Sequence, residues 1–364
     1  MTSTAPWWLT ERTRFAVLSP QRARIALGLL ALLLAACLTA LVTPGPPPAS
    51  RDPAKAAEDR ADVLLYESIV AGLRDGRGYY EVTATALRPF VTFRLPTLAV
   101  VQSAMPVRVA IAMLYLLAAG VVLAWAIRLR PVFRRPPPFA IALVLLIGGM
   151  AAFVQAELVH FHEVWAGLLI ALSLSVRRDD RFAHAIGFGL MAMLIRETAA
   201  LYVLVMAALA LIEGRRREAL GWSLALAVMV PVVAAHAWAV AQVVDATDPA
   251  SPGWTGLLGF GFFVKTMSIS TALAIAPGWC SALLVGLALF GWSAWPGGLA
   301  RRALMTFAAY AMLLSLFGRV DTFYWGLMIA PSFLIGLAFV PDGLKDLITA
   351  AGRRRRITVT RGLR

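Results

Sequence analysis

Long apolar runs recur from about residue 25 to residue 340 and leave no room between them for a water-soluble domain. Hydrophobic residues make up 60% of the 364 residues, charged residues make up only 15%, and the mean hydropathy is +0.75. About 20 apolar residues in a helix cross the hydrocarbon core of a bilayer with every backbone polar group satisfied. The sequence therefore predicts an all-α fold, a single polytopic membrane domain over residues 1–364 with about ten transmembrane helices.

Clusters of arginine beside the apolar runs set the predicted topology, because such clusters mark the cytoplasmic ends of spans. They lie at 12–24, 128–135, 177–181, 215–217, 301–302 and 353–356. Two neighbouring cytoplasmic clusters need an even number of crossings between them. The predicted spans are therefore about 25–42, 107–127, 138–156, 164–176, two within 182–212, 219–241, 268–294, 303–317 and 325–340.

Both termini are cytoplasmic in this topology, and the protein is a multi-pass protein of the inner (plasma) membrane. Residues 1–24 form the N-terminal segment, 43–106 the first extracytoplasmic loop, and 341–364 a basic tail. The arginine clusters also account for the net charge of +14, so membrane lipids are expected partners and nucleic acid is not.

Several predicted spans are too short to cross the bilayer in full. The two within 182–212 have about 14 residues each, or about 21 Å at 1.5 Å per residue, against a hydrocarbon core of about 30 Å. The charged turn between them, 196–198, should then lie below the outer surface. The turns at 157–163 and 318–321 follow the same pattern, which predicts a recessed outer face with charged turns on its floor.

The first loop contains the one long polar segment between spans, residues 58–96. Apolar residues recur there at every fourth position and predict an amphipathic helix: Ala61, Leu65, Ile69 and Leu73. Asp62 and Tyr66 are neighbours at the border of this apolar face. The sequence Asp-Gly-Arg-Gly at 75–78 predicts the turn that ends the helix.

This loop resembles the first extracytoplasmic loop of the GT-C superfamily of membrane glycosyltransferases. Such loops carry an acidic residue, a tyrosine one turn later, a helix, a Gly-x-Gly-Tyr-Tyr-like turn, and then an arginine and a proline before the second span. The matching residues here are Asp62, Tyr66, the run from Gly76 to Tyr80, Arg94 and Pro96. One departure is a long proline-rich lead-in, 43–57, which moves Asp62 away from the first span and makes Asp59 an alternative.

The resemblance implies an inverting transferase. It would move a sugar from a polyprenyl-phosphate carrier to a hydroxyl on a glycan, lipid or protein at the extracytoplasmic face. Asp62 would be the base that takes the proton of the acceptor hydroxyl. The family also usually has a second acidic site after the third span, for which Glu157 or Glu163 is the match, and an Arg/Lys-Glu-Thr turn, matched by Arg196 and Glu197.

The turn at 157–163 holds four ionisable residues, and these are costly at membrane depth unless they are paired or used. Glu157, His160 and Glu163 are spaced three apart, so they can share one helical face. Contact with the substrate, a divalent-cation site and a hydrogen-bonded cap are three open interpretations. No cofactor is certain. For Mg²⁺ or Mn²⁺, the candidate ligands are Asp62, Glu157 and His160.

A leaving phosphate would need cations, and four outer-side arginines or lysines are available. Arg196 can bind a phosphate in a bidentate manner, or it can form an internal ion pair with Glu197. Arg94, Lys265 and Arg319 are the other candidates, and Arg319 shares a short turn with Asp321 and Tyr324. A transporter or lipid flippase is the alternative function, since charged groups at membrane depth are expected there too.

Overall fold

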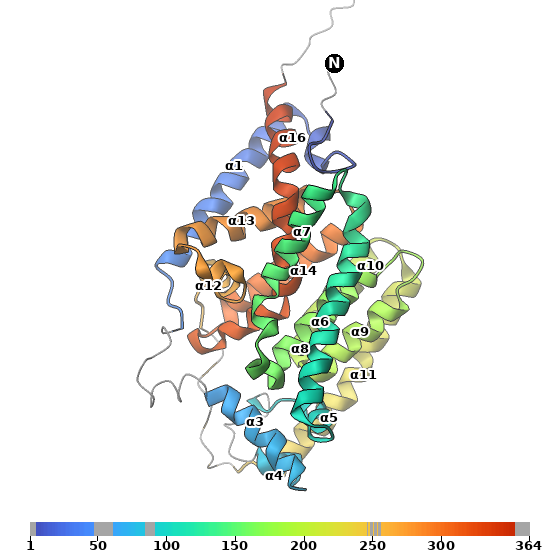
Figure 1. Ribbon diagram of the computed structural model, residues 1–364, viewed down its shortest axis with the longest axis vertical. Helices are drawn as coiled ribbons and strands as arrows, with labels where there is room; N and C mark the ends of the chain where they lie inside the picture. The colour runs from blue at the N-terminus through green and yellow to red at the C-terminus, as the bar shows by residue number, and fades with distance from the viewer. Residues whose placement is uncertain are drawn as a thin grey trace, which may run out of the picture.

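The computed structural model describes residues 5–46, 61–83, 92–245 and 256–353, together with 247, 250 and 253. The regular secondary structure of these residues is helical, and an isolated β-bridge joins Leu9 and Phe133. Figure 1 shows an elongated bundle. The N-terminal segment and α16 lie at one end, called the inner end here, and α3, α4 and α5 lie at the opposite, outer end. The charge pattern predicts that the inner end is cytoplasmic.

The α-helices are α1 (Pro20–Cys37), α3 (Ala61–Arg74), α4 (Tyr79–Val82), α5 (Thr97–Ser103), α6 (Val107–Leu129), α7 (Pro136–Gly149), α8 (His162–Val176), α9 (Ala183–Ile195), α10 (Ala200–Ile212), α11 (Arg216–Ala241), α12 (Phe260–Ile269), α13 (Gly278–Ala294), α14 (Gly298–Phe317), α15 (Ala330–Phe333) and α16 (Val340–Gly352). Short 3₁₀ segments lie between them: η1 (Arg14–Val17), η2 (Leu38–Leu41), η4 (Arg130–Val132), η5 (Ala151–Val154), η6 (Ala156–His160), η7 (Glu197–Ala199), η8 (Ala272–Ile275), η9 (Val320–Met328) and η10 (Leu334–Phe339).

Four helical stretches are long and apolar enough to cross a membrane: Pro20–Leu41, Val107–Val132, Arg216–Ala241 and Gly298–Phe317. A fifth arises if Val320–Met328 and Ala330–Gly352, bent by 62°, count as one broken span. The all-helical membrane fold is therefore confirmed at this level, and the count of ten spans stays a prediction. Shorter apolar helices of 10–17 residues occupy the other predicted spans.

The predicted span 268–294 is broken in the structure. Helix α12 ends at Ile269, and α13 begins only at Gly278, with η8 between them. Pro277 explains the break, because a proline disfavours helical backbone at the residue before it. Ala276 is accordingly extended, with φ −92° and ψ 157°.

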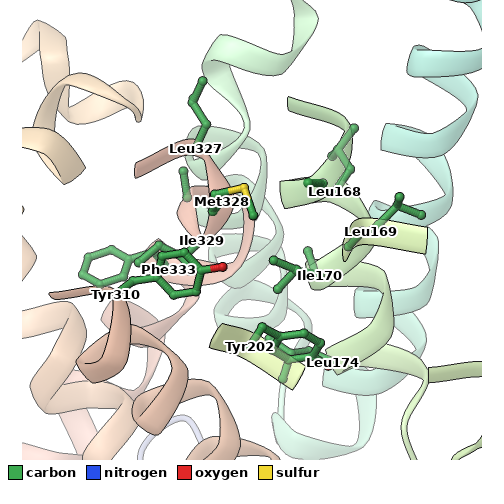
Figure 2. Packing of buried hydrophobic residues seen from close by; sticks show 14 of the residues in the cluster. Leu168, Leu169, Ile170, Leu174, Tyr202, Tyr310, Leu327, Met328, Ile329 and Phe333 are labelled. Carbon is green, nitrogen blue, oxygen red and sulfur yellow. The ribbon is translucent and has the colours of Figure 1, made fainter. Parts of the chain in front are cut away.

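Helix α8 is the centre of the bundle. Its sequence is apolar nearly all round, and nearly every residue is buried, as expected for a helix surrounded by others. Figure 2 shows Leu168, Ile170 and Leu174 of α8 together with Tyr202 of α10 and Phe333 of α15. Helix α8 packs so closely on η9 that a Cβ at Gly167 would collide with the carbonyl oxygen of Leu327. A side chain at this position would therefore push α8 and η9 apart.

Ion pairs close the inner end of the bundle. Arg177, directly after α8, binds Glu218 of α11 through two contacts, Nε–Oε1 at 2.9 Å and Nη2–Oε2 at 2.6 Å. Arg302 of α14 also binds Glu213 through two contacts, Nη1–Oε1 at 2.9 Å and Nη2–Oε2 at 2.7 Å. Arg177, Glu218 and Arg302 are all almost completely buried. Parting these helices would leave charges without partners in a poorly hydrated environment, so the inner end is held firmly.

The N-terminal segment is fastened to the last helix. The backbone N–H groups of Trp7, Trp8 and Leu9 donate to the Asp342 carboxylate at 2.5, 2.8 and 2.8 Å. Thr13 donates to Asp346 from both its backbone and its hydroxyl, at 3.0 and 2.9 Å. Two carboxylates of α16 thus anchor successive turns of this segment, and Asp342 is buried because its charge is compensated by these donors.

Candidate functional site

The amphipathic helix predicted in the first loop is present as α3, Ala61–Arg74. Gly76 ends it with a φ of +83°, a conformation that glycine adopts without strain. Ile69 and Val70 are buried, as is Tyr66, whereas Asp62 in the first turn is partly exposed. Helix α3 packs on α5 and η6, so it lies across the outer end of the bundle.

Two buried arginines flank one buried glutamate at this end. Glu163, at the start of α8, is fully buried, and its Oε1 lies 2.6 Å from Arg196 Nε and 4.0 Å from Arg94 Nη2. Arg94 also donates from Nε to the Tyr66 hydroxyl at 3.1 Å. Arg196 also pairs with the partly exposed Glu197, Nη1–Oε2, at 3.0 Å. The first loop, α8 and the turn after α9 thus meet in one ionic cluster.

The backbone around Arg94 is fixed from two sides. The Tyr79 hydroxyl donates to the Arg94 carbonyl oxygen at 2.6 Å. His236 of α11 has its Nε2 3.3 Å from the Phe93 carbonyl oxygen and its Nδ1 3.0 Å from the Tyr80 hydroxyl. The tyrosine turn of the first loop and a histidine from a distant helix therefore position Arg94 together.

Asp62 lies at the partly exposed edge of this cluster, close to Tyr324 of η9. Burial is the largest effect on this carboxyl and raises its pKa above the ordinary value. Arg94 opposes that shift, while Glu163 and Asp321 add to it. Asp62 is thus a carboxyl with a raised pKa, next to buried cations and still reachable from outside.

Aromatic contacts hold the segments of the cluster together. Phe161 packs edge-on against both Tyr66 and Tyr324, with ring centroids 5.4 and 5.7 Å apart. The guanidinium carbon of Arg196 lies 5.8 Å from the centre of the Trp325 ring, a cation–π distance. These contacts fix η9 against α3 and the turn after α9.

The remaining predicted site residues lie around this cluster or away from it. Glu157 is exposed on η6. His160 is buried, with its Nδ1 2.6 Å from Gln102 Oε1, and lines a cavity of about 10 Å³ beside Tyr66. Arg319 pairs with Asp321, whose charge raises the pKa of Asp62. Lys265 of α12 donates to the Thr43 carbonyl oxygen at 2.5 Å, after the first span, and is not part of the cluster.

The candidate metal ligands Asp62, Glu157 and His160 do not converge. In the part of the chain that the structure describes, no three His, Cys, Asp or Glu side chains are grouped to hold a metal ion. Asp59, the alternative to Asp62, lies outside the described residues.

Three parts of this arrangement were not predicted from the sequence. Tyr324 was assigned to the turn of Arg319, yet it reaches Asp62. The His162 ring lies 5.0 Å from Tyr66 and forms part of the buried wall. The contact of His236 with the first loop was not foreseen either. A single histidine in an apolar span was the one available signal for it.

Comparisons with protein-family models, with curated proteins and with solved structures found no match. The chemistry of the site therefore rests on its own residues. These supply one accessible carboxyl with a raised pKa, two buried arginines and a ring of tyrosines at the outer end of an apolar bundle.

Proposed function

We propose, from this site, that the protein is an integral-membrane glycosyltransferase of the GT-C type. Its donor would be a sugar on a polyprenyl-phosphate carrier, and its acceptor a hydroxyl on a glycan, lipid or protein at the extracytoplasmic face. One observation carries the proposal. Asp62 and Arg94 of the first loop, Glu163 of α8 and Arg196 of the turn after α9 meet at the outer end, and each of these three segments has a sequence feature that resembles that superfamily.

The proposed reaction is a single displacement at the sugar C1. Asp62 takes the proton of the acceptor hydroxyl while its oxygen forms the new bond to C1. The bond between C1 and the phosphate oxygen breaks, and polyprenyl phosphate leaves with the bonding electrons. The raised pKa of Asp62 favours this role, because a base works best when its pKa approaches the working pH. The Tyr324 hydroxyl would orient the carboxylate.

Arg94 and Arg196 are the groups suited to the leaving phosphate. A guanidinium forms bidentate hydrogen bonds with phosphate oxygens, and cations held in place in a poorly hydrated site stabilise the charge that develops there. The Arg94 Nη2 lies 4.0 Å from Glu163, beyond hydrogen-bonding distance, so this nitrogen is not committed to that carboxylate. Glu163 holds the two arginines close together in spite of their mutual repulsion.

The transporter alternative requires the inner end to open. The ion pairs of Arg177 with Glu218 and of Arg302 with Glu213 join α8, α10, α11 and α14 there and are largely buried. Opening would separate charges whose partners are removed from water, at a cost of about 3–5 kcal/mol for each broken pair. An enzyme that works from one side needs no such opening, which favours the transferase.

Donor turnover tests the proposal. The purified protein in lipid receives polyprenyl-phosphate sugars and an envelope extract as acceptor, with and without Mg²⁺ or Mn²⁺, and released polyprenyl phosphate is followed by mass spectrometry. We expect turnover by the wild type and a loss of at least about 100-fold in Asp62→Asn, the usual contribution of a general base. Asp75→Asn, an exposed carboxyl in the same loop, is the matched control and should retain activity.

If Asp62→Asn turns over normally, the base lies elsewhere, with Asp59 the next candidate. Movement of an intact lipid-linked sugar between leaflets, with no bond broken, would support the transporter instead.

A further inference from the structure

An apolar groove of about 570 Å³ lies on the flank of the bundle formed by α1, α13 and α14. Helix α1 contributes Ala26, Leu29 and Leu33, which are spaced on one helical face. Helix α14 contributes Leu304, Ala308 and Met312, again on one face, and Phe15 closes the groove toward the inner end. Small side chains at Ala26 and Ala308 leave this space open. The groove follows two of the helices that are long enough to cross a membrane.

Arginines surround the inner mouth of this groove. Arg22 precedes Ala26 by four residues, so it extends the groove face of α1 by one turn. Arg301 precedes Leu304 by three residues and Ala308 by seven, so it does the same on α14. Arg14 is next to Phe15, and its Nη2 donates to the Trp295 carbonyl oxygen.

These arginines have little acidic compensation. Arg301 pairs with Glu213, a carboxylate that it shares with Arg302 and Arg215. Arg14 Nε is buried and has no hydrogen-bond partner within the described part of the chain. Burial lowers the pKa of Arg14, and the charge of Arg301 adds to this effect. Both α1 and α14 also begin at this end, and helix N-termini attract anions.

We propose that this groove binds an anionic phospholipid of the cytoplasmic leaflet, with an acyl chain along α1 and α14 and the phosphate at Arg14, Arg22 and Arg301. A basic site at the cytoplasmic end of membrane helices is suited to acidic lipid headgroups. The apolar lining excludes a polar ligand from the groove itself. The site lies on other helices than the Asp62 cluster and does not depend on sugar transfer.

Native mass spectrometry of the delipidated protein, titrated with dioleoyl phosphatidylglycerol or dioleoyl phosphatidylcholine, tests this site. We expect phosphatidylglycerol to bind more tightly. Arg14→Gln and Arg22→Gln should each weaken its binding about five-fold and together about thirty-fold, from about 1 kcal/mol per arginine and 1.4 kcal/mol per factor of ten. Ala308→Phe should obstruct the groove and weaken the binding of both lipids. Arg128→Gln, at the inner end of α6, is the control and should change neither.

Four outcomes would overturn the proposal. These are equal binding of the two lipids, an equal loss in the Arg128→Gln control, a protein dimer that forms only without lipid, and displacement of bound phosphatidylglycerol by polyprenyl phosphate. Displacement by polyprenyl phosphate would identify the groove as a binding site for the lipid carrier of the sugar donor. Asp62→Asn should bind phosphatidylglycerol like the wild type, so a failed lipid site and a failed transferase proposal give different results.

Discussion

Replacing Glu163 by glutamine should destabilise the protein strongly, although the two side chains have nearly the same size. Glu163 is fully buried, with Arg196 Nε at 2.6 Å and Arg94 Nη2 at 4.0 Å. At an effective dielectric constant of about 20, charges at these distances attract by about 6 and about 4 kcal/mol. Desolvation of the ions offsets much of this in the native protein, but glutamine leaves both arginines buried without their shared anion. The net loss should be about 3–5 kcal/mol.

Reversible unfolding of the purified protein in mixed detergent micelles measures this difference. Glu157→Gln, on the exposed face of η6, is the matched control and should stay within about 0.5 kcal/mol of the wild type. Arg196→Gln removes one of the two cations, so the double variant Glu163→Gln with Arg196→Gln should lose less stability than the two single losses added together.

A Glu163→Gln variant as stable as the wild type would refute this reasoning. It would mean that the two arginines do not need the charge of Glu163 to remain together.

Three further predictions follow from the structure. The pKa of Asp62 is raised in the folded protein, so the ionised carboxylate destabilises the fold above that pKa, whereas below the ordinary value of about 3.9 the carboxyl is neutral and has no such effect. As pH rises from the ordinary value through the raised pKa, the wild type should therefore lose stability relative to Asp62→Asn, as measured by thermal unfolding at a series of pH values. Asp342→Asn removes a charge that accepts three backbone N–H groups from 7–9, so it should cost about 1–3 kcal/mol and expose the N-terminal segment to protease, whereas Asp75→Asn should not. Gly167→Ala would press against the Leu327 carbonyl and should lower the thermal midpoint, whereas Gly120→Ala, with open space around its Cβ position, should leave it unchanged or higher.

Composition and periodicity were enough to predict the helical membrane fold, because the hydrophobic effect acts on runs of residues that are visible in the sequence. The helix 61–74 and the breaks at 157–163, 196–198 and 318–321 follow from local polarity, and the structure places each where it was expected. The break between α12 and α13 was missed although Pro277 signals it, since a continuous apolar run masked the proline.

The convergence of the site could be predicted only in part. Tyr66 and Arg94 are 28 residues apart, and their hydrogen bond depends on how α3 folds back on the segment before α5. His236 reaches Phe93 from 143 residues away, a contact that no local pattern encodes. Long-range pairings of this kind are set by the packing of whole helices, which a single sequence does not specify residue by residue.

The fastening of the N-terminal segment to α16 has a consequence for biosynthesis. Trp7 and Asp342 are 335 positions apart, so the N-terminal segment cannot find its partner until α16 has been synthesised. Until then the Trp7, Trp8 and Leu9 amides have no native acceptor, and a chain that stops early never acquires one. These contacts at the inner end therefore form only after α16 has been made, and a chain that stops before α16 would leave its N-terminal segment loose and open to proteases.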